Sequence, residues 1–364
     1  MPKMENGSNH SHIHFTHTEF VLFGFPGIIT NRKMLIIPFV IVYILLLSGN
    51  FTIVYRIYVE KSLHAPMYFF ISILFLSSIV CTSSITPKFL LGLSFGLDRI
   101  SRAGCLIQMF SIYSITTFES GVMLSMALDR YVAVYRPLRY NNIMTKQTLV
   151  VLICISWARS VFLVSPVVIL TFSAQYCRSN IILSFVCENM GLLSLACGDI
   201  TKQKMVGLVV RSIITLGDFS LLVLSYSTIL YTAMKIATAK TRTKALNTCG
   251  THLLVAMLIY MCTIISSIIY RMRTSMTIDV LNLVSAIYLM FPATVNPVIY
   301  GLRVKEIRKS LMKSGGDIHT FYIFLSITAD KMPVYHVSKV VTALPPLADA
   351  THLILQEHLL IYNC

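Results

Sequence analysis

The chain has 364 residues, of which 55% are hydrophobic and 12% are charged, whereas about 25% of the residues in an ordinary soluble domain carry a charge. This composition argues against a soluble enzyme. Thirty Lys and Arg against fifteen Asp and Glu give a net charge of +15. A nucleic-acid-binding domain would gather its basic residues on a polar surface, but here they stand singly between long apolar stretches. Insertion in a membrane is therefore the favoured interpretation.

Seven apolar stretches are long enough to cross a membrane as helices, which takes about twenty residues. In chain order they cover approximately residues 35–58, 66–91, 104–128, 148–172, 205–234, 247–270 and 279–302. If the N-terminus is outside, the segments facing the cytoplasm carry more Lys and Arg than those on the opposite side, which is the distribution that the positive-inside rule predicts. The sequence predicts an all-α membrane protein, a bundle of seven transmembrane helices with an extracellular N-terminus.

The third stretch ends in MALDRYVAVYRPLRY, residues 126–140. Asp129-Arg130-Tyr131 resembles the DRY motif of rhodopsin-like G-protein-coupled receptors, and the longer string resembles a signature of olfactory receptors. A carboxylate can hold an Arg at the membrane boundary by a charge-assisted pair, and the released guanidinium can pack against a G protein. If the tripeptide is taken alone, the alternative is an Arg whose charged group extends to the lipid headgroups, with an Asp beside it by chance. The resemblance implies a switch that couples to a G protein.

Further strings resemble the same family, each in register with a span. They are Gly49-Asn50, LHAPMYFF at 63–70, Ser225-Tyr226, KALNTCGTHL at 244–253 and FPATVNPVIYGLRVKEIR at 291–308. Within the last string, Asn296, Pro297 and Tyr300 correspond to the NPxxY element of the family. Pro297 removes a backbone hydrogen bond and leaves a kink that can serve as a pivot. The resemblance covers about residues 15–313 and adds a short amphipathic helix after the seventh span.

The resemblance divides the chain into four regions. Residues 1–34 are expected to be an extracellular segment and 35–302 the seven-transmembrane receptor domain, followed by a cytoplasmic amphipathic helix at 303–313 and an atypical cytoplasmic tail at 314–364, expected to be disordered. The sequon Asn6-Gly7-Ser8 predicts glycosylation at Asn6, with an unmodified flexible tail as the alternative.

Buried polar side chains need an explanation, because each is unfavourable in hydrocarbon unless it is paired or hydrated. Glu119 lies ten residues before Asp129, about 15 Å along a helix and so near the middle of the membrane. The resemblance implies a polar cavity that joins Glu119 with Asn50 and Asn296. Ser78 stands where most relatives carry an Asp, which weakens the case for a sodium site. The alternative is a protonated Glu119 that only packs.

The nine cysteines show no paired spacing for zinc, and no metal site is expected. The resemblance implies a disulfide between Cys105 and Cys187, and a second between Cys177 and Cys197 within the long outer loop. Both would rigidify a lid over the outer cavity. The remaining cysteines within the spans are interpreted as free thiols.

The Phe25-Pro26-Gly27 turn, the KALNTCG string and the long loop at 173–204 resemble the fish-like (class I) subgroup of olfactory receptors, which implies a small polar or acidic odorant. A carboxylate would need a cation, and Arg271 and Arg211 are the candidates. Arg211 and Asp218 share a helix face, so an ion pair between them is an alternative, as is snorkelling to headgroups. The expected pocket walls, with simple packing as their alternative, are Met109, Ile112, Tyr113, Met257, Tyr260 and Tyr288.

The resemblance implies an odorant receptor of the plasma membrane that activates a stimulatory, olfactory-type heterotrimeric G protein and raises cAMP. No cofactor, nucleic-acid partner or enzymatic activity is expected. One alternative is a transporter, whose charged path would use Glu119, Arg159, Arg211 and Asp218, although no internal repeat organises them. Another is a receptor-like product that does not signal, because residues 314–364 continue past the point where relatives usually stop.

Overall fold

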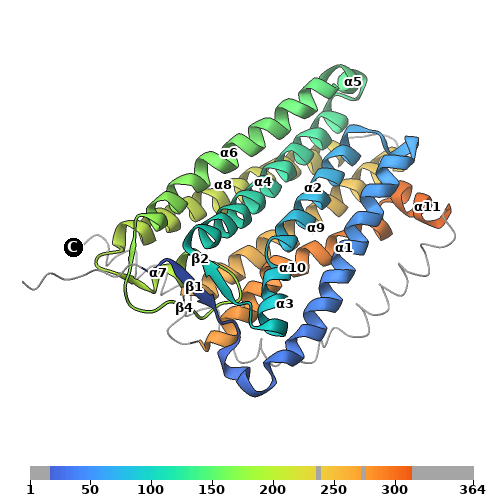
Figure 1. Cartoon of the computed structure of the whole chain (residues 1–364). Coiled ribbons are helices and arrows are strands. Elements are labelled where there is room, and N and C mark those ends of the chain that lie inside the picture. Colours follow the sequence, from blue (N-terminus) through green and yellow to red (C-terminus); the bar gives the residue numbers. More distant parts are fainter. Residues whose placement is uncertain (1–16, 235–238, 272–275, 314–364) are drawn as a thin grey trace, which may run out of the picture. The chain divides into compact units, whose positions relative to one another are not determined.

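A computed structural model describes residues 17–234, 239–271 and 276–313 of the chain. In this part of the chain, seven long helices lie side by side as a bundle (Figure 1). They are α1 (Ile36–Val59), α2 (Pro66–Ser83) with its continuation α3 (Thr86–Phe95), α4 (Arg102–Tyr135), α6 (Lys146–Phe172), α8 (Thr201–Met234), α9 (Ala239–Arg271) and α10 (Ile278–Arg303). Asn6 and the tail at 314–364 lie outside the described residues.

Helix α4 is the centre of the bundle. It packs against α2, α6, α8 and α9. Six other membrane-spanning segments among the described residues are apolar enough to be recognised by length and composition, but α4 is not one of them. Its apolar run is interrupted by Gln108, Glu119 and several hydroxyl side chains. A helix that is covered by other helices can carry such groups, because its neighbours rather than lipid satisfy them.

The second span is broken rather than continuous as predicted. Helix α2 ends at Ser83, and α3 begins at Thr86 with Pro87 in its first turn. Pro87 has no N–H to donate, so the backbone cannot continue the same ladder of hydrogen bonds. The side-chain amide of Gln108 on α4 donates to the carbonyl oxygen of Ser84 at 3.0 Å. This hydrogen bond satisfies a backbone carbonyl at the break in the second span.

The outer side of the bundle carries two small sheets that the sequence did not predict. Strand β1 (Glu19–Leu22) pairs antiparallel with β2 (Arg99–Ser101) and parallel with β4 (Ile181–Ile182). Strand β3 (Gln175–Tyr176) pairs with β5 (Ala196–Cys197), and α7 (Asn189–Leu193) lies between β4 and β5. The segment just before the first span therefore ties the first outer loop to the long outer loop.

Short helical segments join the spans. They are η1 (Pro26–Leu35) before α1, η2 (Lys61–Leu63) before α2, and η3 (Pro137–Arg139) with α5 (Tyr140–Ile143) between α4 and α6. Phe25, just before η1, adopts a left-handed conformation with φ of 57°. Its ring is buried among those of Phe39, Phe89 and Phe185, and this packing holds the unusual turn in place.

The amphipathic helix after the seventh span is α11 (Lys305–Lys313). Arg56 at the inner end of α1 donates from Nε to the hydroxyl of Ser310 at 3.1 Å and from Nη2 to its carbonyl oxygen at 2.5 Å. Ile307 and Leu311 are buried. Apolar burial and one arginine thus fix α11 against the bundle.

Helices α4 and α6 approach each other closely at a glycine. A Cβ atom on Gly121 would lie 2.8 Å from Cβ of Ser156 and 3.3 Å from its Cα. Since a side chain at this position would meet backbone as well as side-chain atoms, the two helices would have to separate. By contrast, a Cβ on Gly217 of α8 would meet nothing within 4 Å.

We expect Gly121→Ala to destabilise the receptor by about 1–3 kcal/mol through overpacking. Gly217→Ala is the matched control and should gain about 0.5–1 kcal/mol, because Ala is the better helix former. Melting temperatures of the two detergent-solubilised variants would test this. Equal melting temperatures would contradict the close contact between α4 and α6.

Candidate functional site

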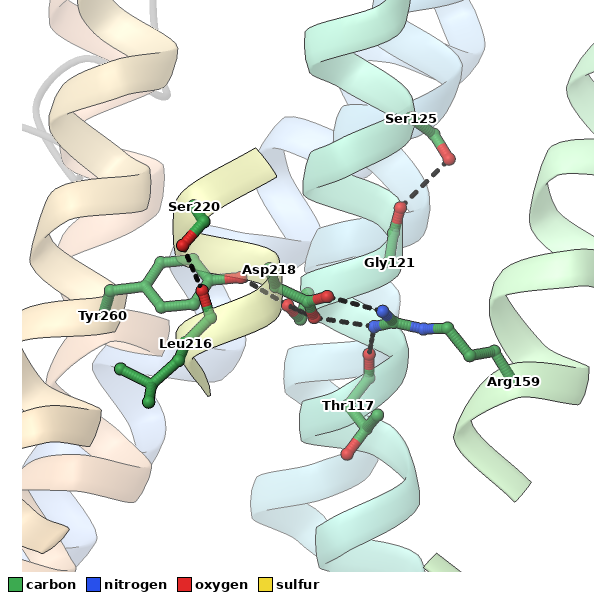
Figure 2. A network of polar contacts seen from close by, with 9 residues as sticks. Thr117, Gly121, Ser125, Arg159, Leu216, Asp218, Ser220 and Tyr260 are labelled. Carbon is green, nitrogen blue, oxygen red and sulfur yellow. Dashed lines mark hydrogen bonds and ion pairs between the residues drawn. The ribbon is translucent and has the colours of Figure 1, made fainter. Parts of the chain in front are cut away.

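A network of polar side chains connects four helices near the middle of the membrane (Figure 2). Arg159 of α6 makes a bidentate ion pair with Asp218 of α8, with Nη1–Oδ1 and Nη2–Oδ2 distances of 2.6 and 2.7 Å. Ser120 of α4 donates to Oδ2 of Asp218 at 2.5 Å, and its oxygen lies 2.5 Å from the hydroxyl of Tyr260 on α9. Nη2 of Arg159 also lies 3.4 Å from the carbonyl oxygen of Thr117.

This network corrects one alternative drawn from the sequence. Asp218 pairs with Arg159 on a neighbouring helix and not with Arg211 on its own helix. Residues seven apart share a helix face, but a planar guanidinium from another helix can approach a carboxylate with both of its nitrogens. The side chain of Asp218 is only 4% exposed, and the pair cancels a charge that hydrocarbon would not tolerate.

A second polar cluster surrounds Glu119. The hydroxyls of Ser77 and Ser78 on α2 each donate to Oε1 of Glu119 at 2.9 Å. Two of the residues predicted for this cavity, Ser78 and Glu119, are therefore in direct contact. The hydrogen bonds of the described residues do not join Asn50 or Asn296 to Glu119, and Asn50 instead contacts α10.

The link made by Asn50 follows from Pro297 inside α10. Pro297 has no N–H, so the carbonyl oxygen of Ala293, four residues earlier, has no helical partner. Nδ2 of Asn50 donates to this oxygen at 2.8 Å and so links α1 to α10. The side-chain oxygens of Asn50 and Asn296 are buried and have no hydrogen-bond partner among the described residues.

The predicted switch lies at the inner end of α4. Nε of Arg130 donates to Oδ2 of Asp129 at 2.8 Å, and Nη2 contacts the same oxygen. The hydroxyl of Tyr140 on α5 donates to the other oxygen of Asp129 at 2.7 Å. Tyr131 stacks on Tyr135, with ring centroids 5.3 Å apart. The structure thus holds the arginine against its neighbouring carboxylate.

A buried histidine that the sequence analysis missed joins the switch region. Nδ1 of His252 on α9 lies 3.0 Å from the hydroxyl of Tyr300 on α10, and Nε2 lies 3.3 Å from the sulfur of Met67 on α2. His252 lies in the KALNTCGTHL string, within the sixth predicted span. A polar residue inside a membrane span could have indicated a buried hydrogen-bonding site. His252 therefore connects α9 to α10 and α2 near the inner face of the bundle.

The long outer loop forms a lid. The structure joins Cys105 to Cys187 and Cys177 to Cys197, with Cα–Cα distances of 5.4 and 5.8 Å. Gln108 on α4 accepts from the backbone N–H of Cys187 at 3.0 Å. Burial raises the pKa of Tyr176 to about 12, so this lid residue stays protonated at neutral pH and donates to the carbonyl oxygen of Thr171 at 2.5 Å.

Several residues predicted to line a pocket take part in packing and hydrogen bonds within the bundle. Met109 and Ile112 are buried in apolar clusters, Met257 is 37% exposed, and Tyr260 belongs to the network around Asp218. A cavity of about 60 Å³ lies between the lid and the outer parts of α9 and α10. Ligand pockets usually measure about 300–1,000 Å³. Its lining residues, including Glu188, Tyr270 and Asn282, were not predicted.

Arg211 lies deeper in the outer half of the bundle. Its Nε donates to the hydroxyl of Ser267 on α9 at 2.8 Å, and its guanidinium carbon lies 5.8 Å from the ring centre of Tyr288. Nη2 of Arg211 is buried and has no hydrogen-bond partner among the described residues. Tyr113 accepts from the backbone N–H of Asn189 in the lid at 3.0 Å. The side chain of Arg271, the other predicted cation, lies outside the described residues.

Comparison with known proteins agrees with these features. A family model described as olfactory receptor matches residues 39–315. The chain belongs to the olfactory receptor family. Human olfactory receptors 52K2 and 52K1 are 37% and 36% identical over 303 residues, which cover 83% of this chain and 96% of each relative. Mouse olfactory receptor 56B34 is 34% identical over 306 residues, covering 84% of this chain and 94% of the relative.

Membership confirms the predicted seven-transmembrane receptor of the plasma membrane. The chain is an odorant-sensing G-protein-coupled receptor and not an enzyme. Coupling to a G protein and a rise in cAMP are typical of this family. Membership in this family excludes the alternative of a transporter.

Removing one member of the Arg159–Asp218 pair should destabilise the receptor by about 3–5 kcal/mol, because the other charge is left unpaired in the membrane. We expect Arg159→Leu and Asp218→Leu each to reduce the melting temperature and the fraction at the cell surface. The double variant should be more stable than either single variant, because no charge remains buried. Losses that simply add would contradict a direct pair.

Proposed function

We propose that this receptor recognises a small acidic odorant in the outer half of the bundle, with the carboxylate bound by Arg211. The observation that carries the proposal is the buried Nη2 of Arg211, which has no hydrogen-bond partner among the described residues. Burying a charged donor without a partner is unfavourable. A carboxylate suits such a group, since guanidinium and carboxylate form short, charge-assisted hydrogen bonds.

The surroundings of Arg211 support the same ligand class. Nε is already fixed by Ser267, so the guanidinium is oriented before a ligand arrives. The ring of Tyr288 lies beside it and offers an apolar surface with a polar end. We place Arg271 in this proposal as a second cation for the carboxylate, nearer to the outer end of α9.

Met109, Ile112, Tyr113 and Met257 remain our proposed walls for the carbon chain of the odorant. Since Met109 and Ile112 are packed in apolar clusters, we propose that binding widens the space around Arg211. A ligand whose affinity is greater for the wider arrangement shifts the equilibrium towards it. Movement of α9 is the most direct route, because Ser267 and Tyr260 are both on this helix.

We propose that this movement is transmitted through Tyr260. Its hydroxyl contacts Ser120, which in turn donates to Asp218, so displacement of α9 breaks a hydrogen bond at the centre of the bundle. Farther in, the same helix carries His252, the partner of Tyr300. Release of these contacts would free Arg130 from Asp129 to meet a stimulatory G protein. Asn50, Ser78, Glu119, Asn296 and Pro297 form the deformable polar centre in this proposal.

Arg211→Gln should raise the half-maximal concentration of a short-chain carboxylic acid at least tenfold, because a hydrogen bond to a charged group is worth about 1.5–3 kcal/mol. The response to an alcohol of the same chain length should not change. Concentration–response curves in a cAMP reporter assay, normalised to surface expression, would measure both. Arg178→Gln removes an exposed outer charge and is the matched control. Equal losses for acid and alcohol would overturn the assignment.

Tyr140→Phe should raise basal cAMP several-fold without any odorant. The substitution removes a donor to Asp129 and so weakens the acceptor that holds Arg130, by about 1.5 kcal/mol. Tyr135→Phe is the control, because its ring can still stack on Tyr131. If both variants kept the basal signal of the wild type, Tyr140 would have no part in the resting state.

A further inference from the structure

The outer end of α10 is tied to the backbone of the lid by the side chain of Asn282. Its Oδ1 accepts from the N–H of Phe185 at 3.0 Å, and its Nδ2 donates to the carbonyl oxygen of Leu183 at 3.1 Å. Nδ2 also donates to the carbonyl oxygen of Ile278, one turn earlier in α10. Asn282 is only 2% exposed. The lid therefore cannot move away from α10 without breaking two buried hydrogen bonds.

A second contact holds α10 one turn nearer to the outside. Asp279 accepts through Oδ1 from the backbone N–H of Gly27 at 3.1 Å. Gly27 belongs to the strap, residues 17–27, which precedes α1. The strap is joined to the lid, because β1 pairs with β4 and a Cβ atom on Gly24 would lie 2.7 Å from Cβ of Phe185. Strap and lid thus form one cover that grips α10 at two successive turns.

The same cover has its base on α4, the centre of the bundle. Cys187 of the lid is joined to Cys105 of α4 by a disulfide. The backbone N–H of Cys187 also donates to Oε1 of Gln108 at 3.0 Å. Asn282 connects this base to α10. The cover therefore fixes the outer end of α10 relative to α4.

Helix α10 runs from this contact to the switch at the inner face. Pro297 removes a helical hydrogen bond, so the two ends of α10 can change their relative direction. At the inner end, the hydroxyl of Tyr300 lies 3.0 Å from Nδ1 of His252. In this arrangement Arg130 is held against Asp129. Contacts between the cover and α10 stabilise this resting arrangement relative to one in which α10 has moved.

The contact at Asn282 lies beside a cavity on the outer side of the bundle. Both Asn282 and Leu183 line the cavity of about 60 Å³ between the lid and the outer parts of α9 and α10. A molecule that occupies this cavity touches both partners of one hydrogen bond. The restraint on α10 is therefore placed where events outside the membrane can act on it.

We propose that the strap and the lid clamp α10 in the resting receptor, with Asn282 as the positioning residue, and that release of this clamp favours the arrangement of α10 that activates the G protein. Asn282 acts through the backbone of the lid and does not need to touch an odorant. The inference goes beyond the acid site at Arg211, because it concerns the receptor without a ligand.

The test measures basal cAMP in cells that express the full receptor without odorant, normalised to surface expression through an epitope at the N-terminus. Asn282→Leu retains a similar volume without polar atoms. It should raise the basal signal about fivefold, because two hydrogen bonds to the lid are lost and each is worth a factor of about two to ten in an equilibrium constant. An unchanged or lower basal signal at the cell surface would overturn the proposal.

Thr171→Val is the matched control. It removes the hydrogen bond from Thr171 to Oδ1 of Asn189, which ties the lid to α6 and not to α10. The basal signal of this variant should equal that of the wild type. If both variants raised the basal signal equally, a general loosening of the lid would explain the effect and the clamp on α10 would be wrong.

Gly27→Ala tests the clamp from the strap and decides the question if Asn282→Leu does not reach the surface. A Cβ atom at this position would overlap with Oδ2 of Asp279, so the carboxylate must turn away and lose its hydrogen bond to the strap. We expect a rise of about twofold in basal cAMP, in keeping with the loss of one hydrogen bond. In that case an unchanged signal would overturn the proposal.

The double variant Asn282→Leu with Arg211→Gln separates this inference from the proposed function. Its basal signal should stay as high as that of Asn282→Leu, because the clamp does not involve Arg211. Its response to a short-chain carboxylic acid should be weakened. Loss of the basal rise would overturn the clamp, whereas an undiminished response to the acid would overturn the acid site alone.

Discussion

The arrangement of this receptor depends on one constraint: inside the membrane, polar groups must find their partners within the protein, because hydrocarbon offers none. The bidentate pair between Arg159 and Asp218 is the strongest case. It would be unfavourable as two separate charges, and as a pair it fixes the distance between α6 and α8. Ser120 extends the pair to α4 and Tyr260 extends it to α9, so one ion pair determines how four helices meet.

The same constraint explains how the broken helices remain stable. At two of the prolines, Pro87 and Pro297, a nearby backbone carbonyl accepts from an amide on another helix. Gln108 reaches Ser84 at the break after α2, while Asn50 reaches Ala293, four residues before Pro297 of α10. A proline that weakens one helix thereby creates a link to its neighbour. Gln108 also accepts from the lid at Cys187, so the lid is connected to the break in the second span.

The sequence predicted what depends on composition and local pattern. Long apolar runs indicated the spans, and the string around Arg130 indicated the switch. It could not predict partners that only the tertiary structure selects. The sequence contains two arginines, Arg159 and Arg211, that could pair with Asp218. Only the packing of the helices decides that Arg159 is its partner. The outer sheets were missed because strands of two to four residues, paired across distant parts of the chain, leave almost no periodic signal.

The polar atoms without partners are as informative as the satisfied ones. Where the network is complete, around Asp218, the bundle is held in one arrangement, because any displacement leaves a charge unpaired. Asn296, beside Pro297 on α10, and Arg211 in the outer half each retain a buried atom with no partner among the described residues. In the proposed mechanism, a ligand at Arg211 would satisfy one of these atoms, and a shift of α10 would do the same for Asn296. In the same mechanism, Tyr260 of α9 is where these two changes are coupled, because its hydroxyl contacts Ser120 of the central network.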